Sequence, residues 1–265
     1  MDLQLSGKLA LVTGSTAGIG LAIARTLASE GAHVVVNGRT QASVVAAIGR
    51  LRAELGKDAS LEGFAADLGN AQECQTLLAA HSKVDILVNN LGIFEPKAFE
   101  AIQDEDWMRF FEVYVMSGVR LSRHYLPRMK MAGWGRIVFI SSDSGLCPAA
   151  EMVHYGMSKT AQLSIARSMA ETTTGTGVTV NSVLPGPTRT EGVEAFFAKL
   201  ADEKGESSQQ FVEHFFDQAR TTSILKRLIG TDEVAALVAF VCSPQASAVN
   251  GTAVRADGGV IRSIG

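Results

Sequence analysis

The chain has 265 residues, of which 46% are hydrophobic and 19% are charged. This composition supports a large buried core and excludes a disordered segment. Its 24 Lys and Arg residues against 27 Asp and Glu residues leave a net charge of −3, so the chain lacks the basic surface that binds nucleic acids.

The sequence indicates neither a membrane segment nor a metal site. No apolar run approaches the roughly 20 residues of a membrane-spanning helix. The three cysteines, Cys74, Cys147 and Cys242, are far apart in sequence and form neither a disulfide framework nor a zinc-binding motif. We therefore expect a cytoplasmic protein that is a single domain over residues 1–265.

Short apolar runs alternate with segments of helical period along the chain. The first helix is predicted over residues 20–30, with Gly31 beyond its end. The apolar runs suit strands that are buried on both faces, and they lie at residues 9–13, 33–37, 86–89, 137–141 and 178–183. This alternation predicts a doubly wound α/β fold, in which a parallel sheet has helices on both faces and binds ligands at the carboxyl ends of its strands.

A glycine-rich segment connects the first strand to the first helix. Glycines at such a connection permit a tight turn and let the backbone approach a pyrophosphate, while the helix N-terminus favours the anion. The alternative is a packing turn that binds no ligand. We interpret the segment as a Rossmann-type dinucleotide site, with candidate cofactor-binding residues Gly14, Ser15, Thr16, Gly18, Ile19 and Gly20.

The end of the second strand bears on the choice of cofactor. An acid there would bind both ribose hydroxyls of NAD, whereas an arginine accommodates the 2′-phosphate of NADP. This chain has the neutral Asn37 followed by Arg39, which favours NADP over NAD unless Arg39 is only a solvated loop residue. Asp67, next to Leu68 at the end of the segment 61–68, is placed to bind the adenine amino group or to cap a helix.

Further motifs follow in order along the rest of the chain. They are Asn-Asn-Leu-Gly at residues 89–92, the pair Ser141-Ser142, Tyr155 and Lys159 in a Tyr-x-x-x-Lys arrangement, the segment 181–186, and Asp257-Gly258-Gly259. With the glycine segment, they span nearly the whole chain. In these motifs the chain resembles the single-domain kind of the short-chain dehydrogenase/reductase family.

Tyr155 and Lys159 are four residues apart, which places both side chains on one face of a helix. A free phenol has a pKa of about 10, and a fixed cation beside it lowers that pKa toward the range used in acid–base catalysis. The resemblance implies that Tyr155 exchanges a proton with the substrate oxygen and that Ser142 hydrogen-bonds this oxygen. It also implies that Lys159 lowers the Tyr155 pKa and binds the cofactor ribose.

The resemblance assigns further residues to the cofactor. The turn after the strand predicted at 178–183 is similar to the family's nicotinamide turn. In that turn, prolines fix the backbone and nearby hydroxyls hold the carboxamide and pyrophosphate. The Asn-Asn-Leu-Gly segment belongs to the cofactor loop. The implied residues are Asn90, Gly92, Pro185, Gly186, Thr188 and Thr190, in addition to Tyr155 and Lys159.

The chain departs from the family at Tyr114, which stands where the family has a catalytic asparagine that is thought to hold a water in the proton relay. Tyrosine is bulkier and lacks the paired carbonyl and amide of asparagine. Three interpretations stay open: the Tyr114 hydroxyl is recruited into a rebuilt relay, the tyrosine lowers turnover, or it is only a packing residue.

The substrate side of the sequence is less specific. Residues 190–227 predict a lid of two short amphipathic helices, at 191–199 and 209–220 around a polar stretch at 201–210; the alternative is a surface hairpin. The chain resembles 3-oxoacyl-carrier-protein reductases, but it has Trp134 and Thr176 where carrier-docking members tend to have arginines. Arg128, Lys130 and Arg136 are nearby, but a solvated basic face explains them as well as the docking of an acidic carrier protein does. We therefore expect a small carbonyl compound or alcohol as substrate.

The sequence as a whole predicts an NADP-dependent oxidoreductase that uses Tyr155 as general acid and base, without metal. The alternative is a cofactor-binding protein with little or no turnover because of Tyr114. His154 is expected to be a packing or surface residue and not a catalytic one. Apolar residues on the helices near Trp107 and Tyr155, including Met108 and Val115, predict a homotetramer or homodimer.

Overall fold

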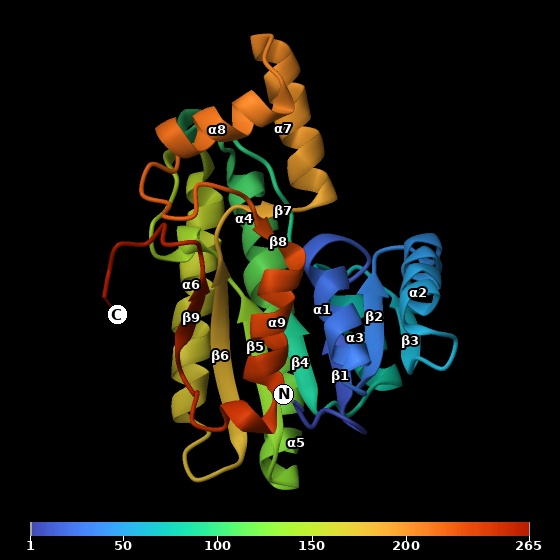
Figure 1. Cartoon of the computed structure of the whole chain (residues 1–265). Helices are drawn as coiled ribbons and strands as arrows, with labels where there is room; N and C mark the ends of the chain where they lie inside the picture. The colour runs from blue at the N-terminus through green and yellow to red at the C-terminus, as the bar shows by residue number, and fades with distance from the viewer. Residues whose placement is uncertain (1, 265) are drawn as a thin grey trace.

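The centre of the computed structural model, which describes residues 2–264, is a seven-stranded parallel sheet (Figure 1). Its spatial order is β3-β2-β1-β4-β5-β6-β9. The strands are β1 (Leu9–Val12), β2 (His33–Gly38), β3 (Leu61–Ala65), β4 (Ile86–Asn89), β5 (Gly135–Ile140), β6 (Val178–Pro185) and β9 (Ala253–Ala256). The order reverses between β1 and β4, which is the switch point where such sheets bind ligands. The predicted doubly wound α/β fold of the Rossmann type is confirmed.

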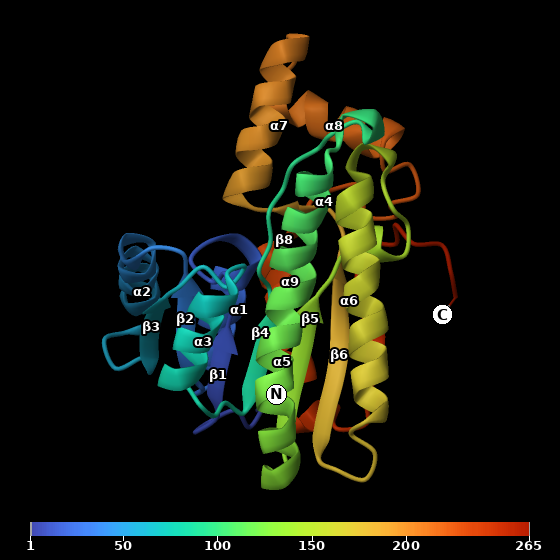
Figure 2. The ribbon, with the colours of Figure 1, turned by 180° about the vertical axis from the view of Figure 1, so that it is seen from behind.

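Helices cover both faces of the sheet, and each face has its own hydrophobic core (Figures 1 and 2). One face packs against α1 (Gly18–Ser29), α2 (Gln41–Leu55) and α9 (Thr231–Cys242). The other face packs against α3 (Ala71–Ala80), α5 (Ser117–Ala132) and α6 (Val153–Glu171). Successive residues of a strand point to opposite faces, so Ala10 enters one core and Leu11 the other. This explains why the strand sequences are continuously apolar.

A long helical rod runs along the back of the sheet (Figure 2). It begins with α4 (Asp104–Phe111), widens into a π-helical turn over Glu112–Met116, and continues as α5. The family-like helix expected around Trp107 is therefore interrupted. Such a turn commonly marks a functional site, and here it contains Tyr114.

The segment expected to form a lid rises above the carboxyl ends of the strands as α7 (Glu191–Lys204) and α8 (Ser208–Gln218). Both predicted helices are present, but they extend into the polar stretch 201–210, because α7 continues to Lys204 and Ser207 caps α8 in a capping box. The two helices share a small core around Phe197, Phe211 and Phe216.

A separate two-stranded sheet joins the two ends of this insertion. It pairs β7 (Thr188–Arg189) with β8 (Ile229–Gly230) in parallel. The sequence analysis identified neither strand, because two residues carry no readable periodicity. The two ends of the insertion are thus held together by this small sheet.

His154, the second residue of α6, packs against the helical rod. Its side chain is fully buried, and its ring centroid is 3.8 Å from that of Phe110 and 6.1 Å from that of Trp107. Among the residues that the structure describes, neither ring nitrogen has a hydrogen-bond partner. The prediction that His154 is a packing residue is confirmed.

The burial of His154 predicts a pH-dependent stability. Burial lowers the pKa of His154 below its ordinary 6.5, so the unfolded chain takes up a proton that the folded chain does not. The contribution to stability is complete above about pH 6.5 and is lost as the pH falls below that value. Urea unfolding of the wild type at a series of pH values measures this, and His154→Leu is expected to reduce the slope between about pH 7 and 5. An equal slope in both proteins would contradict the assignment.

Candidate active site

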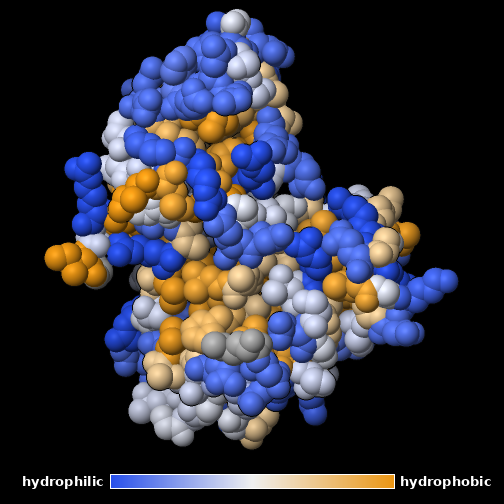
Figure 3. Space-filling model, in the orientation of Figure 1, coloured by the Kyte–Doolittle hydropathy of each residue, from blue (hydrophilic) through white to orange (hydrophobic). Residues whose placement is uncertain are grey.

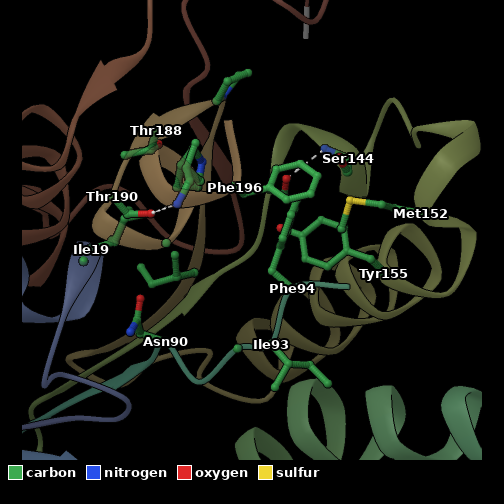
Figure 4. Close-up of a pocket in the computed structure, with 18 of the residues that line it drawn as sticks. Ile19, Asn90, Ile93, Phe94, Ser144, Met152, Tyr155, Thr188, Thr190 and Phe196 are labelled. Atoms are coloured by element: carbon green, nitrogen blue, oxygen red, sulfur yellow. Dashed lines mark hydrogen bonds between the residues drawn. The ribbon is translucent and has the colours of Figure 1, made fainter. Parts of the chain in front are cut away.

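A cavity of about 770 Å³ lies at the carboxyl edge of the sheet, between the glycine loop, the ends of β4 to β6, and the lid helices (Figure 4). Most of the predicted site residues meet on its wall. They are Gly14, Thr16, Gly18, Ile19, Gly20, Arg39, Asp67, Asn90, Gly92, Ser142, Tyr155, Lys159, Pro185, Gly186, Thr188 and Thr190.

Three predicted cofactor residues, Ser15, Asn37 and Leu68, are fully buried and do not line the cavity. The Ser15 hydroxyl accepts a hydrogen bond from the Asn37 backbone N–H at 3.0 Å, and the Asn37 side-chain oxygen accepts one from the Gly14 N–H at 3.1 Å. Both residues therefore hold the glycine loop from beneath. Leu68 packs into the core on the α3 side, because its side chain points away from the sheet edge.

The glycine loop is closely packed against the chain that follows β4. A Cβ atom at Gly20 would lie 2.4 Å from the side-chain nitrogen of Asn90, so only glycine fits there. Asn90 in turn donates hydrogen bonds to the carbonyls of Thr13 and Gly14 at 3.0 and 3.1 Å. The N-cap residue of α1, Ala17, makes no side-chain hydrogen bond to the start of the helix. The exposed N–H groups and the close approach of backbone fit the pyrophosphate of a dinucleotide.

An acidic side chain of the lid reaches this helix start, which the sequence analysis did not foresee. The Gly18 N–H donates to the carboxylate of Glu191, the first residue of α7, at 3.2 Å. Arg50 of α2 lies 3.7 Å from the same carboxylate and donates to the Thr16 carbonyl at 2.6 Å. Glu191 thus accepts the hydrogen bond of an N–H group that would otherwise face a bound anion.

Arg39 and Asp67 lie on the wall of the cavity at the ends of the neighbouring strands β2 and β3. Arg39 is exposed. The Asp67 carboxylate accepts a hydrogen bond from the Gly69 N–H at 3.0 Å, whereas Asn70 caps the following helix α3. The helix-cap alternative for Asp67 is therefore wrong.

Ser142 follows β5 and lines the cavity together with Tyr155 and Lys159 of α6. The Lys159 ammonium donates to the Ile140 carbonyl at 2.7 Å, and it lies 5.5 Å from the ring centroid of Tyr155. The Ile140 carbonyl is at the end of β5. Lys159 therefore connects helix α6 to the strand that carries Ser142.

Burial dominates the ionisation of this cluster. It raises the pKa of Tyr155 to about 12, partly opposed by the Ser142 hydroxyl, and it lowers the pKa of Lys159 to about 7. The expected lowering of the Tyr155 pKa is not found in this arrangement, because loss of solvent around the phenol outweighs the nearby charges. The proximity of Tyr155 and Lys159 is nevertheless as the sequence predicts.

This geometry agrees with the comparison of the chain with known proteins. The family model for short chain dehydrogenases matches residues 8–201. The chain belongs to the short-chain dehydrogenase/reductase family. It is 51% identical to the oxidoreductase YvaG of Bacillus subtilis (strain 168), with all of both chains covered.

Solved structures of reductases have the same fold as this oxidoreductase. L-sorbose reductase from Gluconobacter frateurii, in complex with NADPH and L-sorbose, superposes with a TM-score of 0.92 at 29% identity, and all of both chains are covered. YwfH, an NADPH-dependent reductase of bacilysin biosynthesis, has a TM-score of 0.86 at 27% identity, covering 98% of this chain and 100% of YwfH. In residues 2–264 of the oxidoreductase, no helix is long and apolar enough to cross a membrane.

Tyr114 of the oxidoreductase is buried, and its hydroxyl is bonded to the backbone after β4. This hydroxyl accepts from the Ile93 N–H at 2.8 Å and donates to the Ile93 carbonyl. Its ring lies 4.4 Å from the Lys159 ammonium and stacks edge-on against Tyr155, with 5.5 Å between ring centroids. Tyr114 therefore joins the π-helical turn to the Ile93 backbone and directs its proton away from both family residues on α6.

A second set of charged residues that the sequence analysis missed lies beside Ser142. The Ser142 hydroxyl donates to the Asp143 carboxylate at 2.8 Å, and burial raises the pKa of Asp143. Arg220, just beyond α8, lies 3.9 Å from Asp143 and 3.7 Å from Glu151. These contacts join segments that are distant in sequence, and no short motif marks them.

The three basic residues near the fifth strand do not form a common surface. Arg136 is 2% exposed, lies 4.5 Å from the ring centroid of Trp134, and donates to backbone carbonyls including that of Ser243. It is a core residue, which corrects the expectation of a solvated basic face. Arg128 and Lys130 donate to backbone carbonyls of His124 and Thr172.

The contact of Glu191 with Gly18 predicts competition between the lid and a bound anion. Glu191→Gln is expected to tighten NADPH binding about two- to fivefold, since a charge at a helix N-terminus is worth about 0.3–1 kcal/mol. Fluorescence titration of NADPH measures this without turnover. Glu194→Gln is the matched control. Glu194 lies in the same first turn of α7 as Glu191, but its carboxylate pairs with Arg189. Unchanged or weaker NADPH binding in Glu191→Gln would show that Glu191 does not compete.

Proposed function

We propose that the protein is an NADP-dependent reductase of small carbonyl compounds that also oxidises the corresponding alcohols. One observation carries this proposal: Ser142, Tyr155 and Lys159 line the same cavity as the glycine loop. A substrate oxygen that reaches Ser142 and Tyr155 would therefore lie in the same space as a dinucleotide seated on that loop.

The residues on one side of the cavity fit a nicotinamide dinucleotide. The start of α1 would hold the pyrophosphate, Asp67 the adenine, Lys159 the ribose, and the turn with Thr188 and Thr190 the nicotinamide end. When bound, the cofactor supplies the hydride for reduction of the carbonyl carbon.

The side chains of this protein would supply the proton and orient the substrate. The Tyr155 phenol donates its proton to the substrate oxygen, and its raised pKa keeps it protonated for reduction. Lys159, whose pKa of about 7 lets it gain or lose a proton near neutrality, adjoins the phenol. Ser142 orients the substrate oxygen.

The preference for NADP rests on Arg39. Its guanidinium is exposed on the cavity wall at the end of β2, where a 2′-phosphate would meet it. The neutral Asn37, turned inward beneath the glycine loop, leaves no acid for the ribose hydroxyls of NAD. L-sorbose reductase, in complex with NADPH, and YwfH, an NADPH-dependent reductase, support this preference.

The remaining proposals concern the surroundings of the site. Residues 190–227 would act as a substrate lid within the single domain 1–265, and the protein would be a cytoplasmic homotetramer or homodimer. Met108 is 58% exposed and remains a candidate for the subunit interface, whereas Val115 is buried and does not.

The alternative is a cofactor-binding protein without turnover. Tyr114 is the feature that favours it, because its ring covers the Lys159 ammonium. The deciding experiment measures NADPH oxidation with a panel of ketones and aldehydes beside a direct titration of NADPH. Turnover supports the reductase, and binding without turnover across the panel supports the alternative.

Tyr155→Phe removes the proton donor and keeps the volume of the ring. Turnover is expected to fall by at least about a hundredfold, which is typical for loss of a general acid. The melting temperature and the NADPH dissociation constant should stay close to those of the wild type. If most of the turnover survives, the proton comes from another group.

Arg39→Ala tests the cofactor preference. Loss of a charge-assisted contact costs about 1.5–3 kcal/mol, so NADPH is expected to bind roughly ten- to a hundredfold more weakly. NADH has no 2′-phosphate, and its dissociation constant should hardly change. A wild type that already binds NADH more tightly than NADPH would refute the role of Arg39.

A further inference from the structure

The part of the cavity under the lid is lined by aromatic side chains from two separate segments. Phe196 and Phe215 come from the lid helices, and Phe94 comes from the chain after β4. The rings of Phe94 and Phe196 meet edge to face, with 5.2 Å between their centroids. Figure 4 shows both rings close to Tyr155, on the side away from Asn90 and Ile19.

Phe94 is unusual because 52% of it is exposed although it lines a cavity. A large apolar ring at the mouth of a cavity is a feature of ligand sites, where the ligand removes it from water. The outer surface of the lid is largely hydrophilic, and the hydrophobic surface lies beneath, where lid and body meet (Figure 3). The apolar side of the lid therefore faces the cavity.

The cation nearest to the aromatic rings of the lid is already paired with acids. The Arg220 guanidinium lies 3.9 Å from the Asp143 carboxylate and 3.7 Å from the Glu151 carboxylate. The guanidinium is thus already paired with two carboxylates. A substrate carboxylate would have to displace one of them or lie beside both, and either arrangement is unfavourable.

We propose that the substrate is an uncharged carbonyl compound with an aromatic or similarly bulky apolar group, seated against Phe94, Phe196 and Phe215. Its carbonyl oxygen lies at Ser142 and Tyr155. This inference rests on the proposed reductase function and adds the class of substrate. It excludes keto acids by charge. It also excludes polyhydroxylated ketoses, because an aromatic wall leaves buried hydroxyl groups without partners.

The first experiment compares three ketones under identical conditions with NADPH. They are 4-phenyl-2-butanone, the keto acid 4-oxopentanoate, and the ketose L-sorbose. The aryl ketone is expected to have the highest kcat/KM, by at least about a hundredfold if its ring is fully buried. An equal or higher kcat/KM for the keto acid or the ketose overturns the proposed substrate class and leaves the reductase function intact. No turnover of any ketone, with NADPH bound, overturns the reductase function itself.

A pair of phenylalanine variants tests the aromatic wall. Phe94→Ala is expected to lower kcat/KM for 4-phenyl-2-butanone about tenfold and to change that for 2-butanone less than about threefold. Phe99→Ala is the matched control, since Phe99 is 59% exposed and does not line this cavity. The NADPH dissociation constant should be unchanged in both. Equal kinetics for Phe94→Ala and Phe99→Ala would overturn the role of the wall.

Glu151→Gln tests the charge argument separately. The side chain of Glu151 is 54% exposed, so the variant should fold like the wild type. Removing this charge makes the set of Asp143, residue 151 and Arg220 neutral. The ratio of kcat/KM for 4-oxopentanoate to that for 4-phenyl-2-butanone is expected to rise at least about threefold. An unchanged ratio would remove charge as the reason for excluding carboxylates.

Discussion

The N–H groups at the start of α1 are the constraint on which the site is built. The N-cap residue Ala17 offers no side-chain acceptor to this helix, whereas Thr40 and Asn70 cap the next two. The open groups require an anion or an acceptor from outside the helix. The glycines that keep them accessible, the Asn90 amide that fixes the loop, and the lid carboxylate that reaches them are all arranged around this requirement.

Two different environments meet at Tyr155. On the side of the glycine loop, the wall consists of backbone and small polar groups that suit phosphates and sugars. On the lid side it consists of aromatic rings. Tyr155 and Ser142 line the same cavity as both walls, so in the proposed reaction a carbonyl group held there would be open to both sides. The lid has its own small core and a single anchoring sheet, so it adds the apolar side of the cavity without disturbing the two main cores.

Features that depend on neighbouring residues were predicted from the sequence. The strand–loop–helix unit, the proximity of Tyr155 to Lys159, and the packing role of His154 all follow from local spacing and residue type. The extended runs of apolar residues also gave the fold class, because parallel strands are buried on both faces.

Features that depend on distant segments were not predictable in this way. Glu191 reaches Gly18 across 173 positions of sequence, and Arg220 reaches Asp143 only because the lid folds back over the sheet. Arg136 was grouped with surface charges because the sequence does not show that its guanidinium donates to the backbone carbonyls of Ser243, Gly135 and Gly177. The raised pKa of Tyr155 depends on distant segments in the same way, since its burial is set by the whole tertiary structure.

The π-helical turn at Glu112–Met116 has a consequence for how this region tolerates change in length. A π turn contains one more residue than the corresponding α-helical turn, and the wider turn takes up that residue within one continuous rod. The rod thereby holds Phe110 against His154 and brings the hydroxyl of Tyr114 to the Ile93 backbone. Deleting one residue would remove the widening, and the side chains within the turn would point in new directions. The length of this turn, and not only its residue types, therefore sets which side chains surround Tyr155.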